Sequence, residues 1–151
     1  MTTSRRVTIL LAEDDVDDRQ LTIEALTECR MANDLHCVKD GRELIDYLCH
    51  QGVHAAPVEA PRPTLILLDL NMPRMDGREA LAEIKADPRL RGIPIVILTT
   101  SSSDVDVCHT YGLGANSYIA KPVTFDGLVR AMMALKRYWF QLVELPGTSP
   151  C

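Results

Sequence analysis

Five polar residues stand where hydrophobic runs of this sequence stop. Glu13 and Asp14 follow the run VTILLA, Asp69 follows LILL, Thr99 ends IVILT and Lys121 follows SYIA. If these runs are parallel strands of one open α/β sheet, the five side chains project from its carboxyl edge, where such folds bind ligands. The sequence therefore predicts one pocket that contains three carboxylates, a hydroxyl and an ammonium group.

The carboxylates of Glu13, Asp14 and Asp69 predict a bound cation, because burying like charges together is costly unless a cation neutralises them. Mg²⁺ is the expected ion. It prefers oxygen ligands and keeps several waters, so one or two carboxylates and a backbone carbonyl suffice. For the pair Glu13 and Asp14 alone, capping of the following helix would be the better interpretation. The remainder of the set, Asp69, Thr99 and Lys121, favours the metal.

Asp69 directly ends the run LILLD, so a rigid strand holds its carboxylate at the sheet edge. Carboxylate attack on a phosphoryl group requires in-line approach and charge neutralisation, which a metal ion and Lys121 can supply. Thr99 adds a hydroxyl donor, although alone it would be interpreted as a β-branched residue that ends a strand. Pro122 favours an extended peptide at Lys121 and can aim the ammonium over the sheet edge. The alternative is a solvated lysine before a turn.

Hydrophobic periodicity predicts the elements that position these groups. A doubly wound, five-stranded parallel sheet with helices on both faces is expected, and the run LILLDLN is expected at its centre. In the first helix, Leu21, Ala25, Leu26 and Cys29 recur at helical spacing. Residues 52–63 contain three prolines and no apolar period, so they are predicted to form a long loop. The predicted strands are 7–13, 35–39, 65–71, 94–99 and 117–121, and the predicted helices are 17–29, a segment from residue 41, 77–86, 104–113 and 125–138.

Composition narrows the class of protein. The chain has 151 residues and a net charge of −5, with no cluster of Lys and Arg, so no nucleic-acid binding is expected. Apolar runs are too short for a membrane span, and no signal peptide is recognised, so no membrane association and a cytoplasmic location are expected. The five cysteines form no CxxC pair and are expected to be reduced and mostly buried.

In this order, the segments resemble the receiver domain of two-component response regulators, over about residues 8–138. That family has an acidic pair after the first strand, a phosphorylated Asp after the third, Thr or Ser after the fourth, and Lys-Pro after the fifth. The resemblance implies the flavodoxin-like (βα)5 fold and phosphorylation of Asp69 by a sensor histidine kinase. It also implies a phosphoacceptor signalling protein that is not an enzyme but promotes its own phosphorylation and dephosphorylation.

The resemblance also implies roles for the other site residues. Asp14 and Asp69 match the direct Mg²⁺ ligands, Glu13 matches a ligand through water, and Asn71 offers its backbone carbonyl. Glu13 stands where many relatives carry Asp, a variation that is common within the family. Switch residues are implied as well: Tyr118 matches the aromatic residue that turns inward when Thr99 moves toward the phosphoryl group, and Lys121 and Pro122 match the Lys-Pro pair.

Residues 1–138 are expected to form the receiver domain, and 139–151 a C-terminal apolar extension, with no separate output domain. The signal would then pass through phosphorylation-dependent binding to an unknown downstream protein. The segment from Met72 to Asp104, the loop 52–63 and the tail resemble single-domain regulators that partner bacterial phytochromes. A phytochrome-type histidine kinase is therefore the expected partner.

The tail is predicted to form an interface, most simply in a homodimer, because its side chains are too apolar for a free end. Packing of the tail on its own subunit is the alternative. The residues concerned are Trp139, Phe140, Leu142, Val143 and Leu145.

Three other functions compete with this interpretation. A Mg²⁺-dependent aspartyl phosphotransferase of the haloacid-dehalogenase type needs an acid-base Asp where this chain has Asn71. A flavodoxin-like FMN binder needs a Ser, Thr or Gly-rich loop where this chain has acidic residues. An interaction module that works without phosphorylation remains, and phosphoryl incorporation would distinguish it.

Overall fold

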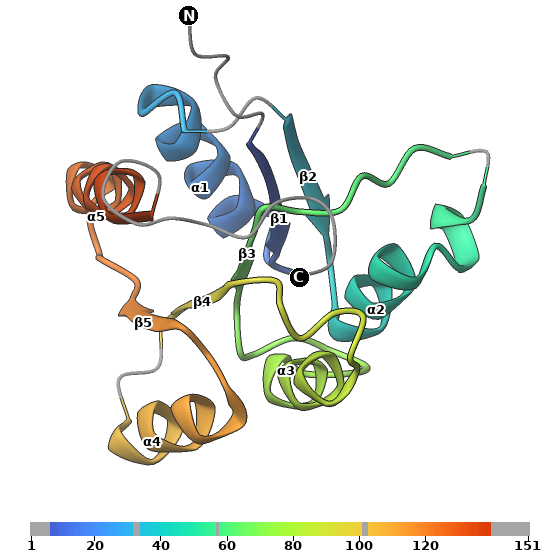
Figure 1. Cartoon of the computed structure of the whole chain (residues 1–151). Helices are drawn as coiled ribbons and strands as arrows, with labels where there is room; N and C mark the ends of the chain where they lie inside the picture. Colours follow the sequence, from blue (N-terminus) through green and yellow to red (C-terminus); the bar gives the residue numbers. More distant parts are fainter. Residues whose placement is uncertain (1–6, 32–33, 57, 101–102, 140–151) are drawn as a thin grey trace, which may run out of the picture.

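The structure is a computed structural model and describes residues 7–31, 34–56, 58–100 and 103–139. Its five strands form one parallel sheet in the order β2-β1-β3-β4-β5, and helices alternate with them along the chain (Figure 1). This arrangement confirms the predicted doubly wound α/β fold, with β3 at the centre. The elements are β1 Thr8–Ala12, α1 Val16–Glu28, β2 Asp34–Val38, α2 Gly41–Cys49, β3 Leu65–Leu68, α3 Gly77–Ala86, β4 Ile95–Thr99, α4 Asp104–Leu113, β5 Ser117–Ala120 and α5 Phe125–Arg137.

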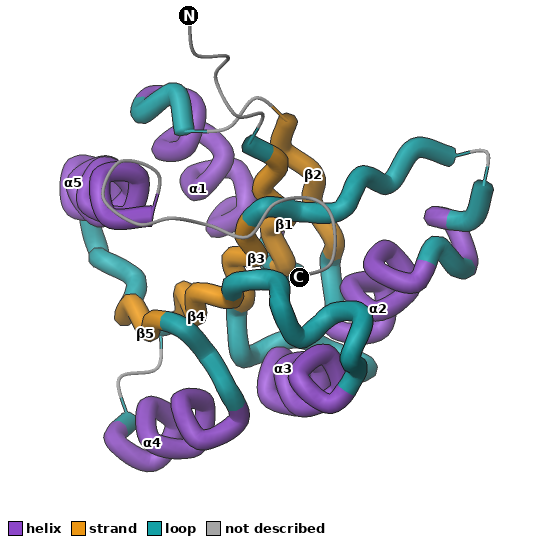
Figure 2. The backbone as a smooth tube through the Cα atoms, viewed as in Figure 1, coloured by secondary structure: helices purple, strands orange, loops and turns teal. Residues whose placement is uncertain are grey.

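Two hydrophobic cores lie on the two faces of the sheet. In Figure 2, α1 and α5 lie on one side of the sheet, and α2 and α3 lie on the other. β3 contributes to both, because alternate side chains of a strand point to opposite faces. Ile66 and Leu68 pack into the core beneath α2 and α3, whereas Leu65 and Leu67 pack into the core beneath α1 and α5. All four side chains are fully buried. The near-continuous apolar run of this strand therefore follows from its central position.

Polar side chains start the helices soon after the strands end. The N-cap residues of α1, α2, α3 and α5 each accept a hydrogen bond from a backbone N–H in the first turn. Such caps typically contribute about 1 kcal/mol each to helix stability. These caps fix where each of the four helices begins after the preceding strand. These N-cap residues are Asp15, Asp40, Asp76 and Thr124.

The structure corrects three details of the sequence analysis. Leu21 is 43% exposed, because α1 turns Thr22, Ala25 and Leu26 toward the core instead. Among its described residues, the loop 52–63 contains one 3₁₀ turn, Gly52–His54. Among the described cysteines only Cys29 is buried, although all four are free thiols.

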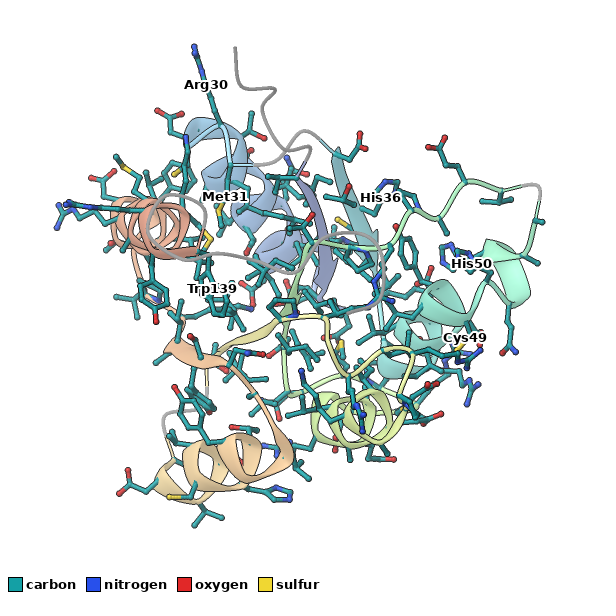
Figure 3. All side chains as sticks on the ribbon, viewed as in Figure 1. Arg30, Met31, His36, Cys49, His50 and Trp139 are labelled. Carbon is teal, nitrogen blue, oxygen red and sulfur yellow. The ribbon has the colours of Figure 1, made fainter. Side chains whose placement is uncertain are left out.

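Trp139 packs into the core of its own subunit. Its side chain is 8% exposed and belongs to the cluster beneath α1 and α5, beside the end of α5 (Figure 3). For this residue the alternative of packing on the same subunit is confirmed. Phe140, Leu142, Val143 and Leu145 lie outside the described residues, so their role in an interface stays a prediction. Within the described part of the chain, no helix is long and apolar enough to cross a membrane.

The backbone of the connection from β3 to α3 packs closely against two glycines, Gly41 and Gly77. The backbone N–H of Gly41 donates to the carbonyl of Met75 at 2.8 Å, and that of Gly77 donates to the carbonyl of Leu70 at 2.9 Å. A methyl group on Gly41 would collide with the Met75 carbonyl, and one on Gly77 with the Asp69 carbonyl. Both positions therefore need glycine because the backbone approaches too closely for a side chain.

Replacing Gly77 with Ala should destabilise the protein by about 1–3 kcal/mol, because the added methyl group displaces the backbone at Asp69. The free energy of unfolding in urea measures this change. Gly112→Ala in α4 is the matched control: its new methyl group meets nothing within 4 Å. That substitution should stabilise the helix by about 0.5–1 kcal/mol. Equal unfolding free energies for the two variants would contradict this account of the β3–α3 connection.

Candidate functional site

The carboxylates of Glu13, Asp14 and Asp69 converge at the carboxyl edge of β1 and β3. These strands are neighbours, with Ala12 paired to Leu68, so the residues that follow them emerge side by side. The backbone N–H of Asp69 donates to the carbonyl of Ala12 at 3.0 Å, which fixes this register. One carboxylate oxygen of each acidic residue lies within 4.8 Å of the other two. The predicted cluster therefore forms, at the point where the strand order reverses.

The chemistry of this cluster suits a hard divalent cation. Glu13 and Asp69 are buried and Asp14 is exposed. Oxygen ligands with one side open to water match the preference of Mg²⁺ for carboxylates and retained waters. Among the described residues, this is the only group of three or more His, Cys, Asp or Glu side chains close enough to bind one ion.

Lys121 brings a positive charge to the cluster from β5, a strand at the edge of the sheet. It follows β5, and its backbone N–H donates to the carbonyl of Thr99 at 2.7 Å. Its ammonium donates to Glu13 Oε1 and, at 3.4 Å, to Asp18 Oδ2. The Lys121 side chain is 10% exposed, so it is not the solvated lysine of the alternative interpretation. Burial would lower the pKa of Lys121, but the ion pair with Glu13 and the charges of nearby carboxylates outweigh it and raise that pKa.

Glu13 is the most perturbed of the acidic groups. Burial raises the pKa of its carboxyl from 4.5 to about 7, and the negative charge of Asp69 adds to this effect. The hydrogen bond from Lys121 acts in the opposite direction without cancelling it. In the absence of a metal, this carboxyl therefore keeps its proton to a higher pH than an ordinary glutamate does.

Thr99 provides a polar atom that lacks a partner. Its side chain is fully buried at the end of β4, and its Oγ1 has no hydrogen-bond partner among the described residues. A buried hydroxyl without a partner is costly in a folded protein. The arrangement suits a hydroxyl that is reserved for a ligand oxygen.

The remaining predicted site residues surround this edge. Tyr118 on β5 is partly buried and packs against the core cluster beneath α2 and α3. Pro122 follows Lys121 and is partly buried, and Asn71 is exposed just beyond Asp69. The metal-binding role of the Asn71 carbonyl and the switching role of Tyr118 stay predictions.

Sequence reasoning missed three contacts around the site. The carboxylate of Asp40 pairs with Arg74 at 2.7 Å, and that of Asp106 pairs with Arg78 at 2.8 Å, which links α4 to α3. The third contact joins Asp18 to Lys121. In the sequence, Asp18 gave only the signal of an acidic residue in the first turn of a helix.

Comparisons with known proteins agree with this geometry. Residues 9–133 match the family described as the response regulator receiver domain. Response regulator Rcp1 of Synechocystis sp. is 41% identical over 139 residues, which cover 92% of each chain. The crystal structure of the phosphorylated cyanobacterial phytochrome response regulator RcpA has a TM-score of 0.86 and 40% identity, and it covers 95% of this chain and 100% of its own. The Mn²⁺-bound form of Rcp1 has a TM-score of 0.84 and 40% identity, over 93% and 99%.

The raised pKa of Glu13 predicts how stability depends on pH without a metal. Because the folded-state pKa exceeds the unfolded one, this carboxyl contributes stability below about pH 4.5 that is lost as the pH rises through about 7. In EDTA, the unfolding free energy should therefore fall by about 1–3 kcal/mol between about pH 5 and 8. Urea unfolding across this range measures the fall.

Glu13→Gln provides the control, because it removes the titrating group while keeping its size. Its unfolding free energy should vary less with pH than that of the wild type. Millimolar Mg²⁺ should also reduce the variation in the wild type, since a bound cation favours the ionised carboxylates. Identical pH profiles for wild type and Glu13→Gln would refute the prediction.

Proposed function

This chain belongs to the response regulator receiver domain family, and from that membership we propose that it is a signalling protein that accepts a phosphoryl group on Asp69. The observation that carries the proposal is the convergence of Asp69 with two further carboxylates within 4.8 Å and with the Lys121 ammonium. A carboxylate nucleophile, a cation site and a fixed positive charge are the parts that phosphoryl transfer requires.

The donor is the phosphorylated histidine of a sensor kinase. An oxygen of Asp69 attacks the phosphorus, the bond from phosphorus to the imidazole nitrogen breaks, and the imidazole takes up a proton. Asp14, Asp69 and the Asn71 carbonyl would hold Mg²⁺, and Glu13 would act through water. The ion, when bound, supplies charge neutralisation for the transferred group. Lys121 adds a second positive charge, and the Thr99 hydroxyl donates to a phosphoryl oxygen.

Signalling follows from a shift between two conformations. A phosphoryl group on Asp69 draws Thr99 and Lys121 toward it, and the Tyr118 ring moves into the space that Thr99 leaves. The face formed by α4, β5 and α5 then settles into its alternative arrangement and binds a downstream protein. The buried hydroxyl of Thr99, which has no hydrogen-bond partner among the described residues, supports this step, because a phosphoryl oxygen would supply one.

A phytochrome-type histidine kinase is the proposed donor, and the protein acts in the cytoplasm. The support for this partner is the likeness to a phytochrome response regulator over nearly the whole of both chains.

Incubation with acetyl phosphate and Mg²⁺ should label the wild-type protein, and Asp69→Asn should abolish the label. The acyl phosphate cannot form without the Asp69 carboxylate. Mass spectrometry of the intact protein measures the added phosphoryl group. Asp126→Asn, an exposed aspartate in the first turn of α5, serves as the matched control and should be labelled like the wild type.

Equal labelling of wild type and Asp69→Asn would end the assignment. No labelling of either would favour an interaction module that works without phosphorylation. With a phosphorylated phytochrome-type kinase as donor, transfer to the wild type should be faster than from unrelated histidine kinases. If acetyl phosphate labels the protein but the phytochrome-type kinase transfers no phosphoryl group, the proposed partner is wrong and the phosphorylation of Asp69 is not contradicted.

We also propose a homodimer in which residues 140–151 contribute to the interface. Trp139 already packs in its own subunit, so a chain that ends at Trp139 keeps the core intact. Light scattering should give a dimer for the full chain and a monomer for the shortened one. A dimer that survives the truncation, or a monomer in both cases, would contradict this proposal.

A further inference from the structure

Asp18 holds the Lys121 ammonium together with Glu13. Its Oδ2 lies 3.4 Å from Lys121 Nζ, although the two positions are 103 apart in the sequence. An ammonium has three N–H donors, and two of them are directed at these carboxylates. Asp69 acts on Lys121 through its charge. Within the described part of the chain, the hydrogen bonds of this ammonium therefore go to carboxylates other than Asp69.

The two partners differ in how firmly they hold Lys121. The Glu13 side chain is 2% exposed, whereas that of Asp18 is 43% exposed. Water screens the attraction between an ammonium and an exposed carboxylate, so this contact is weak and easily exchanged. Asp18 is therefore the partner that Lys121 gives up first when another anion competes.

The position of Asp18 is fixed by the start of α1. Its backbone N–H donates to Asp15 Oδ1 at 2.9 Å, and its carbonyl accepts from the Thr22 hydroxyl at 2.9 Å. The carboxylate of Asp18 is thus presented from a rigid turn of helix. A charge held in this way attracts Lys121 whether or not Asp69 carries a ligand.

We propose that Asp18 is a positioning residue that competes with a phosphoryl group on Asp69 for the Lys121 ammonium. This inference rests on the proposed function of Asp69. In the unmodified protein, Asp18 and Glu13 keep Lys121 on the α1 side of the pocket. A phosphoryl group must draw Lys121 away from Asp18, which lowers the affinity of the site for that group.

The competing explanation is that Asp18 only supplies negative charge to the start of α1, where it interacts favourably with the helix dipole. Asp17 separates the two explanations. It lies in the same first turn, carries the same charge and is exposed. Asp17→Asn therefore reproduces the loss of charge at the helix start, and Asp18→Asn adds the loss of the contact with Lys121.

Beryllium trifluoride, which takes the place of a phosphoryl group on an aspartate, is the probe, and calorimetry at saturating Mg²⁺ gives its dissociation constant. Asp18→Asn should bind it about two- to fivefold more tightly than Asp17→Asn, the range for a partly exposed ion pair. Asp18→Glu keeps the charge and should retain the wild-type dissociation constant. In about 1 M salt the ratio between the two Asn variants should approach one, because salt screens the contact.

Equal dissociation constants for the two Asn variants, or weaker binding by Asp18→Asn, would overturn the role of Asp18. Thermal unfolding of both variants reports the effect on α1, and the midpoint of Asp18→Asn should fall at least as far as that of Asp17→Asn, because it also loses the contact with Lys121. If the wild type neither binds beryllium trifluoride nor accepts a phosphoryl group, the proposed function of Asp69 fails and the inference falls with it. If the wild type is labelled normally and the two Asn variants bind beryllium trifluoride equally, the role of Asp18 is refuted and the proposed function of Asp69 stands.

Discussion

Carboxylates gathered at one edge of a sheet repel one another, and the surrounding structure must offset that repulsion. β1 and β3 lie side by side, so the charges of Glu13 and Asp69 cannot separate without breaking the register between these strands. Lys121 offsets part of this charge from β5, at the far end of the sheet order. The remaining negative charge gives the site its affinity for a cation. The residues at this edge thus form one electrostatic unit, although they come from distant parts of the chain.

The same edge is connected mechanically to the rest of the molecule. Arg78, in the first turn of α3, makes two hydrogen bonds to the Asp106 carboxylate on α4. Both side chains are partly buried, so this pair is screened less than a fully exposed ion pair. α4 is therefore tied to the helix that starts just after the Asp69 loop. A displacement of that loop has a direct route to α4, which is part of the face proposed to bind a partner.

Most of the fold could be predicted from the sequence, and the contacts that hold the site only in part. Hydrophobic runs located each strand to within a few residues, because a buried parallel strand is apolar on both faces. The cluster of Glu13, Asp14 and Asp69 was also predictable, since each residue ends such a run or directly follows it. The prediction that Leu21 faces the core was wrong because Leu21 and Thr22 fit the helical spacing of α1 equally well, and Thr22 is the one that is buried. Pairs such as Asp18 with Lys121 depend on how α1 and β5 meet in space, which local periodicity does not determine.

The β3–α3 connection has a consequence for how the chain tolerates insertions and deletions. The backbone of residues 70–76 is enclosed between Gly41 and Gly77, and the ion pair between Asp40 and Arg74 fastens it further. An added or missing residue there would shift the Asp69 carbonyl and break both backbone contacts. The loop 52–63 makes no comparable backbone contact with the carboxyl edge among the described residues. Insertions and deletions should therefore be tolerated in the loop between α2 and β3 but not in the connection between β3 and α3.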